Sequence, residues 1–339
     1  MSALFHSYLC GRNAAEWLII MDVGTAQKGC STCGQQIDPD SVFCTQCGTK
    51  TGGAVSLDSV PMQSQKDKFN GKQFSILGDS ISTLEGYNPK GYNLFFTGET
   101  CQKAGVSDMN DTWWGQVISC CGGELLVNNS WSGSRVTKLP NRDSLFPSGC
   151  SDERTNGLHI GNIKPDVIIV YLGSNDWGYG VEVTNRDYAM WSSVFETAYS
   201  KMLEKLKVNY PHAEIFCCTL CSTYMSGKPS FVFPENYGGI NIEKYNAVIR
   251  NAAESKNCNV IDLYKYHLPY DSIDGSHPNL DGMHTLAALM LREMFPDIEY
   301  TVLEPKDMCQ NSNGTRADLN NHQNLPKHKG LFGKLFGGK

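Results

Sequence analysis

From residue 74 onward, short apolar runs alternate with amphipathic stretches. Several runs are rich in Val and Ile, as expected of strands that are buried on both faces. The five runs lie at Phe74–Leu77, Leu125–Val127, Val167–Leu172, Ile215–Leu220 and Val260–Leu263. Helical patterns lie at Trp191–Val208, Glu243–Ser255 and Asp281–Met294. This alternation predicts an α/β domain with a five-stranded parallel sheet between helices and a site at the carboxyl edge of the sheet.

The segments outside this region lack its apolar periodicity. Residues 1–20 are an N-terminal extension that is either disordered or not a genuine part of the protein. Residues 21–50 contain a cysteine cluster, residues 51–71 form a polar linker, and residues 72–304 form the large domain. Residues 305–339 begin with an Asn-rich tract and end in a lysine-rich stretch without acids, which predicts a disordered basic tail. Docking of this tail to a membrane or a partner groove is the alternative.

Composition and charge are those of an ordinary soluble protein. Hydrophobic residues make up 40% of the chain, charged residues 19%, and the net charge is −6, so nothing attracts nucleic acid strongly. The early apolar run Ala14–Met21 is neither a convincing signal peptide nor a membrane span. The chain has 14 cysteines, most of them scattered, which fits a reducing, cytoplasmic location. Cys217, Cys218 and Cys221 are predicted to pack in the core.

Four cysteines are spaced as metal ligands. Two Cys-x-x-Cys-Gly units place Cys30, Cys33, Cys44 and Cys47 so that four thiolates can surround zinc. The segment resembles the short zinc-ribbon domains of bacterial proteins, in which the metal is structural. Few charges lie between Lys28 and Lys50, so docking of a protein partner is favoured over nucleic-acid binding. Because these ligands complete the coordination of zinc, no cofactor is predicted for catalysis.

A serine, a histidine and an aspartate suggest nucleophilic catalysis. Ser80 directly follows the first apolar run, where a sheet-end turn presents its hydroxyl, but a serine needs a base. His277 is the leading base because Asp274, three residues earlier, can accept a hydrogen bond from one imidazole nitrogen. His284, in the following helix, has no acid at that spacing and is predicted to be a packing or capping residue.

Several short blocks identify residues 72–304 as similar to the SGNH hydrolase family, also called GDSL esterases and lipases. The blocks are Gly78-Asp79-Ser80, Asn128 to Gly133, Gly173 to Asp176, and Asp274 to His277. The resemblance implies a flavodoxin-like three-layer α/β/α fold and a triad of Ser80, Asp274 and His277. It implies an oxyanion hole formed by the backbone N–H groups of Ser80 and Ser130 and the side chain of Asn175. Ser130 stands where the family usually has glycine, and its N–H remains available as a donor.

Aromatic and basic residues near these blocks are candidates for substrate binding. Trp131, Trp177 and the pair Trp113-Trp114 are candidate platforms for a sugar ring, with core packing as the alternative. Arg135 and Arg154 are candidates for holding an anionic group, with surface ion pairing as the alternative.

The sequence thus predicts a serine esterase that removes a small acyl group, with acetyl as the first candidate, from a carbohydrate-like compound. A lysophospholipase or thioesterase for longer acyl chains is the alternative enzyme. An inactive SGNH scaffold whose ribbon and tail bind partners is the alternative outside enzymes, although no member of the triad is missing.

Overall fold

The computed structural model describes residues 28–29, 36–37, 68–138, 146–184 and 191–296. Within the first two ranges, β1 (Lys28–Gly29) pairs with β2 (Gln36–Ile37) in antiparallel fashion. The predicted zinc ligands, the extension 1–20, most of the linker and the tail 305–339 lie outside the described residues.

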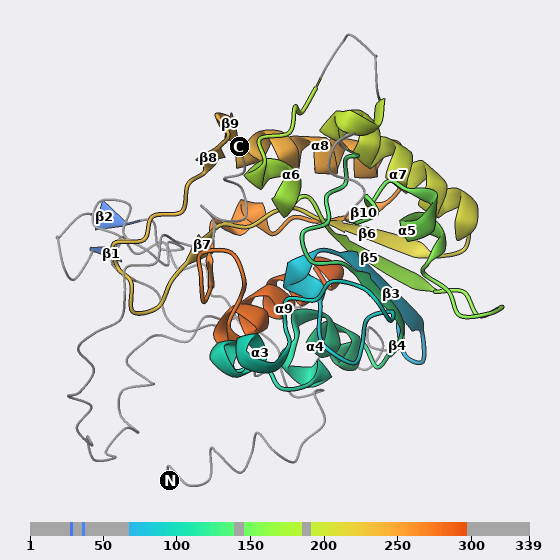
Figure 1. The fold of residues 1–339 in the computed structure, drawn as a ribbon, viewed down its shortest axis with the longest axis horizontal. Helices are drawn as coiled ribbons and strands as arrows, with labels where there is room; N and C mark the ends of the chain where they lie inside the picture. Colours follow the sequence, from blue (N-terminus) through green and yellow to red (C-terminus); the bar gives the residue numbers. More distant parts are fainter. Residues whose placement is uncertain (1–27, 30–35, 38–67, 139–145, 185–190, 297–339) are drawn as a thin grey trace, which may run out of the picture.

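A five-stranded parallel sheet forms the centre of the large domain (Figure 1). Its strands are β3 (Gln73–Gly78), β4 (Glu124–Ser130), β5 (Val167–Tyr171), β6 (Glu214–Cys218) and β10 (Asn259–Ile261). Their spatial order is β4-β3-β5-β6-β10, which is the flavodoxin-like order. The predicted three-layer α/β/α fold is therefore confirmed, and the five apolar runs are its strands.

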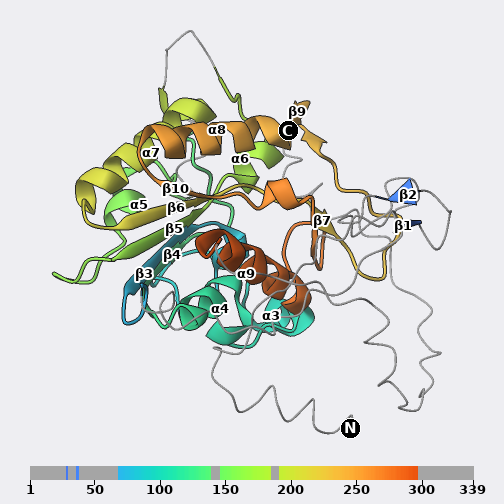
Figure 2. The ribbon, with the colours of Figure 1, turned by 180° about the vertical axis from the view of Figure 1, so that it is seen from behind.

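Helices cover both faces of the sheet, as Figures 1 and 2 show. On one face lie α3 (Gly98–Ala104), α4 (Trp113–Cys120) and α9 (Leu280–Met294). On the other lie α5 (Asp152–Asn156), α6 (Ser174–Gly178), α7 (Phe195–Asn209) and α8 (Ile242–Ser255). Alternate residues of a strand point to opposite faces, so Ile169 packs against the first layer while Ile168 and Val170 pack against the second. Both faces of the central strands β3, β5 and β6 are covered, which explains why these strands are largely apolar.

The helix predicted over 191–208 begins later than expected. Residues Trp191–Ser193 form a 3-10 turn (η4), Val194 is extended with φ −110° and ψ 131°, and α7 begins at Phe195. The apolar repeat continues through Val194 because this residue is buried, although its backbone is not helical. The other two predicted helices begin one residue earlier than expected, after the capping residues Asn241 and Asn279.

Small elements extend past the carboxyl edge of the sheet. There β7 (Thr223–Tyr224) pairs with β11 (Tyr270–Asp271), and β8 (Asn236–Tyr237) pairs with β9 (Ile240–Asn241). The first pair joins the segment after β6 to the loop that leads into α9. Among the described residues, no helix has the length and apolar character needed to cross a membrane.

Candidate active site

The predicted site blocks meet where the strand order reverses, between β3 and β5. The last residue of β3, Gly78, pairs with Ser130 at the end of β4 and with Tyr171 at the end of β5. Ser80 and Asn175 follow these strand ends directly. In open parallel sheets this reversal leaves a crevice at the carboxyl edge.

Ser80, His277 and Asp274 form one hydrogen-bonded chain. Ser80 Oγ lies 2.9 Å from His277 Nε2, and His277 Nδ1 lies 2.8 Å from Asp274 Oδ2. Because the Asp274 carboxylate can only accept, Nδ1 carries the proton and Nε2 is left to accept from the Ser80 hydroxyl. The other carboxylate oxygen accepts the backbone N–H groups of Ser276 and His277, at 3.0 and 2.8 Å. Burial by itself raises the pKa of Asp274, but His277 and these hydrogen bonds hold it below its usual value.

The turn that carries Ser80 is fixed by its neighbours in the sequence. Asp79 caps the 3-10 turn η2 (Ser80–Ser82), because its carboxylate accepts the Ile81 N–H at 3.0 Å. Gly78 has no room for a side chain, since a Cβ there would lie 2.7 Å from the Ser82 hydroxyl oxygen and 2.8 Å from that of Ser130. The Gly-Asp-Ser sequence is therefore required by packing as well as by chemistry.

Two tryptophans hold the same turn from the core. The indole N–H of Trp113 donates to Ser82 Oγ at 3.2 Å, and that of Trp114 donates to the Ser82 carbonyl at 3.0 Å. Both side chains are fully buried. The interpretation of this pair as a sugar platform is wrong, because neither ring face is accessible, and the alternative of core packing is correct.

Asp79 also connects the two strand ends. The hydroxyl of Ser174, the residue before Asn175, donates to the second carboxylate oxygen of Asp79. Burial raises the pKa of Asp79 above its usual value. The nucleophile turn and the start of α6 are thus joined by one buried carboxylate.

The remaining predicted oxyanion residues lie on either side of Ser80. Asn175 is half-buried at the start of α6, and its Nδ2 donates one hydrogen to the Ser134 carbonyl at 2.9 Å. Ser130 is fully buried at the end of β4. The amide of Asn88 donates to the carbonyls of Asn128 and Ser130, at 3.0 Å each. Asn88 thus fixes the strand end that presents Ser130, a role that no signal in the sequence indicates.

Arg154 is fully buried, so the prediction that it holds a substrate anion is wrong. Its guanidinium donates to the carbonyls of Gly78 and Asn129 at 2.8 and 2.9 Å, and to the side chains of Asn129 and Ser134 at 2.8 and 2.6 Å. A further bond goes to the Pro147 carbonyl. Burial lowers the pKa of Arg154 to about 10, which leaves it protonated at neutral pH. Its role is to tie together the ends of β3 and β4.

Arg135 is also fully buried and is not open to a substrate. Its guanidinium carbon lies 5.1 Å from the centre of the Tyr179 ring and 5.9 Å from that of Phe146. The prediction of an anion-binding role is wrong here as well. Next to it, the buried Asp176 accepts the backbone N–H groups of Val136 and Thr137, at 2.8 and 3.0 Å, which fastens this loop to α6.

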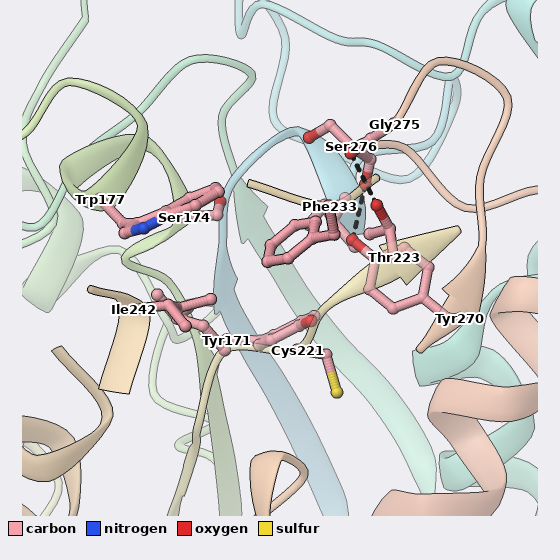
Figure 3. Close-up of a pocket in the computed structure, with 12 residues that line it drawn as sticks. Tyr171, Ser174, Trp177, Cys221, Thr223, Phe233, Ile242, Tyr270, Gly275 and Ser276 are labelled. Carbon is pink, nitrogen blue, oxygen red and sulfur yellow. Dashed lines mark hydrogen bonds between the residues drawn. The ribbon is translucent and has the colours of Figure 1, made fainter. Parts of the chain in front are cut away.

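Trp131 and Trp177 differ in exposure. Trp131 is half-buried and its ring centre lies 4.3 Å from that of Tyr92. Trp177 is 5% exposed, so it offers no open face for a sugar. It instead lines a narrow pocket beside the triad, where its ring stacks on Phe233 at 5.2 Å (Figure 3). The indole N–H groups of both tryptophans are buried and have no hydrogen-bond partner within the described ranges.

A phenylalanine that sequence reasoning missed lies against the catalytic histidine candidate. Phe95 stacks on the His277 ring with 3.3 Å between ring centres and 7° between planes. Its backbone N–H donates to the Thr83 hydroxyl at 2.9 Å, which holds Phe95 near the Ser80 turn. His284 lies half-buried in α9, where burial lowers its pKa. The ring nitrogens of His277 contact both a serine and an orienting acid, Ser80 and Asp274.

Together, the covered sheet and the serine, histidine and aspartate at its switch point form a candidate catalytic site on a flavodoxin-like fold. Residues 72–226 match the family model of the GDSL-like lipases and acylhydrolases, and residues 30–51 match that of a zinc-ribbon domain. Two parts of the chain therefore match known domain families, a GDSL-like lipase/acylhydrolase domain over residues 72–226 and, before it, a zinc-ribbon domain.

Individual proteins support this assignment. The chain is 27% identical over 169 residues to a multidomain esterase from Ruminococcus flavefaciens, a match that covers 48% of this chain and 20% of that protein. It is also similar to the crystal structure of a GDSL-like lipase from Bacteroides ovatus, with 25% identity and a TM-score of 0.53. That match covers 67% of this chain and 99% of the other. A GDSL-like lipase from Bacteroides uniformis gives 25% identity and a TM-score of 0.50, over 67% and 97% of the two chains.

Proposed function

We propose that this protein hydrolyses a short-chain acyl ester through a covalent acyl-enzyme on Ser80. The observation that carries the proposal is the continuous chain from Ser80 Oγ through the His277 ring to Asp274. His277 Nε2 takes the hydroxyl proton as Ser80 Oγ attacks the ester carbonyl carbon. When the ester C–O bond breaks, the same proton passes to the leaving alcohol. Water, activated by His277 in turn, then releases the acid and restores Ser80.

The negative charge on the carbonyl oxygen needs donors while the tetrahedral intermediate exists. We assign this role to the backbone N–H groups of Ser80 and Ser130 and to the Asn175 side chain. Asn175 Nδ2 has two hydrogens and gives one to Ser134, which fixes the amide and leaves the other for the oxyanion. One such donor typically contributes a factor on the order of 100 to 1000 in turnover.

The preferred substrate is an acetyl or similarly small ester of a carbohydrate-like alcohol. Among the tryptophans predicted as sugar platforms, Trp131 is the one that could lie beneath a sugar ring, because it is half-buried and directly follows Ser130. The esterase from Ruminococcus flavefaciens supports an ester substrate in general and no particular alcohol. A lysophospholipase or thioesterase acting on long acyl chains stays the alternative.

A panel of p-nitrophenyl acetate, butyrate and palmitate tests the proposal. We expect the wild-type chain to favour the short esters, Ser80→Ala to abolish turnover, and Ser230→Ala, at an exposed serine, to leave it unchanged. An alkylphosphonate probe should label wild-type Ser80 covalently and leave Ser80→Ala unlabelled. Activity that survives in Ser80→Ala would contradict the triad assignment. A preference for palmitate would favour the enzyme for long acyl chains. A wild-type chain that is inactive and unlabelled would favour the inactive scaffold.

For the N-terminal domain we propose that Cys30, Cys33, Cys44 and Cys47 bind one structural Zn²⁺ and that the ribbon docks a protein partner in the cytoplasm. Four thiolates at this spacing suit tetrahedral zinc, and the ribbon is too small to fold on its core alone. Zinc should co-purify with the wild-type chain and with Cys101→Ser, and should be lost from Cys30→Ser without loss of esterase activity. Equal zinc content in all three proteins would contradict this assignment.

A further inference from the structure

The pocket beside the triad has a feature that the family assignment does not explain. Its lining includes the residues directly next to the nucleophile, the oxyanion donor and the base, namely Ile81, Ser174 and Ser276. We infer that this pocket receives the acyl chain of the substrate and that Phe233 limits the length of that chain. The inference rests on the proposed ester hydrolysis and specifies one half of the substrate.

Most of the surface that lines the pocket is apolar. Side chains of Tyr171, Leu220 and Ile242 are buried and line the side toward the sheet and α8. The hydroxyls of Thr223 and Tyr270 are already donated to carbonyls of the loop that carries His277, at 2.8 and 2.6 Å. The hydroxyl groups of a sugar would lose hydrogen bonds with water in this pocket and form few with the protein, so binding would be unfavourable in free energy. An alkyl chain loses nothing polar and gains burial.

Phe233 lines the pocket and lies on a segment without regular secondary structure. Along it, side chains alternate: Phe231 and Phe233 point inward and are partly buried, whereas Val232 is 82% exposed. Figure 3 shows the Phe233 ring between Trp177 on one side and Thr223 on the other. Its near-parallel contact with Trp177, at 5.2 Å and 19°, fixes its position.

The geometry of acyl transfer decides which half of the ester enters this pocket. The leaving alcohol must lie where His277 Nε2 can return the proton, and the carbonyl oxygen must face the oxyanion donors. The acyl chain must then extend from the carbonyl carbon in the third direction, away from the leaving alcohol and the oxyanion donors. Because the pocket offers carbon surface beside all three groups, it fits that chain better than a polyol.

The test compares p-nitrophenyl acetate, butyrate, hexanoate and octanoate in wild type, Phe233→Ala, Phe233→Leu and the control Val232→Ala. For wild type, kcat/KM should fall sharply at hexanoate. Phe233→Ala should raise the hexanoate-to-acetate ratio by about tenfold or more, since each methylene newly buried contributes roughly fourfold. Phe233→Leu should give an intermediate ratio, and Val232→Ala should match wild type. Thermal unfolding of each variant checks that the fold is kept.

The outcomes separate this inference from the proposed function. If acetate is hydrolysed in a Ser80-dependent manner but the ratio in both Phe233 variants equals that of Val232→Ala, the pocket assignment is overturned and the esterase stands. If folded wild type hydrolyses none of the esters and is not labelled by the phosphonate, the proposed function fails and the pocket assignment fails with it. If Phe233→Ala does not fold, the hexanoate-to-acetate ratio of kcat/KM measured for Phe233→Leu tests the pocket assignment in its place.

Discussion

The two sides of the crevice around Ser80 are built from opposite chemistry. On one side, the polar side, Arg154, Ser134 and Asn175 form a buried hydrogen-bond network that reaches the carbonyls of Gly78 and Asn129. On the other, the acyl pocket, aromatic and aliphatic side chains make contacts that need no defined direction. Hydrogen bonds fix distances and angles, whereas apolar contacts mainly fill volume.

This difference separates two tasks in one site. Each bond on the polar side joins segments that are distant in the sequence, so a single substitution displaces several reactive groups at once. A side chain in the pocket contacts only its neighbours, so its substitution changes the available space. We therefore expect changes on the polar side to alter stability or turnover for every ester, and changes in the pocket to alter the choice among esters.

The largest effect is expected from Arg154→Met. This change removes the guanidinium from the buried carbonyls of Gly78 and Asn129 and from the side chains of Asn129 and Ser134. Each lost partner costs about 1 to 3 kcal/mol, while the Gly78 carbonyl keeps the Trp131 N–H at 3.2 Å, so the free energy of unfolding should fall by roughly 3 to 5 kcal/mol. Denaturant unfolding measures it. Lys201→Met is the control, because Lys201 makes an ion pair with Glu204 in which both side chains are exposed, and it should contribute little. Equal stability of the two variants would mean that the polar side is not held by Arg154.

Asn175→Ala should give the next largest effect. The loss of an oxyanion donor lowers kcat by a factor on the order of 100 to 1000 for acetate and butyrate alike, since the donor faces the carbonyl that all esters share. Steady-state kinetics on both esters measures this, with the exposed Asn110→Ala as a control that keeps full activity. A loss of kcat for only one of the two esters would assign Asn175 to the acyl pocket and would contradict its place on the polar side.

The sequence predicts the framework of the site better than its lining. The strands can be predicted because both faces of the central strands are covered. The hydrogen-bonded pair of Asp274 and His277 can be predicted because the two residues lie three positions apart after a strand. The roles of Arg154 and Trp114 cannot be predicted from the sequence. Their types suggest ligand binding, but their partners include backbone carbonyls 25 to 76 residues away in the chain.

Residues that line the crevice without reacting are even harder to predict. Phe95 and Phe233 lie in segments without regular periodicity, so nothing local shows that the rings point into the site. Their positions depend on long-range contacts with His277 and Trp177. A phenylalanine in such a segment carries no chemical signal, unlike a cysteine pair or a catalytic block.

The smallest of the expected effects concerns Phe95. This residue belongs to neither side of the crevice and stacks on His277, the proposed general base, which lies between the two sides. When His277 takes the Ser80 proton, its ring becomes a cation in face contact with Phe95. Such a contact is worth about 0.5 to 1.5 kcal/mol, so Phe95→Leu should lower kcat by roughly 2- to 10-fold. Because the cation forms only during the reaction, KM should stay nearly constant. Tyr87→Leu, on the same segment but packed on Trp114, should change neither quantity. A rise in KM at constant kcat would instead place Phe95 in the substrate-binding surface. The acyl pocket would then reach as far as His277.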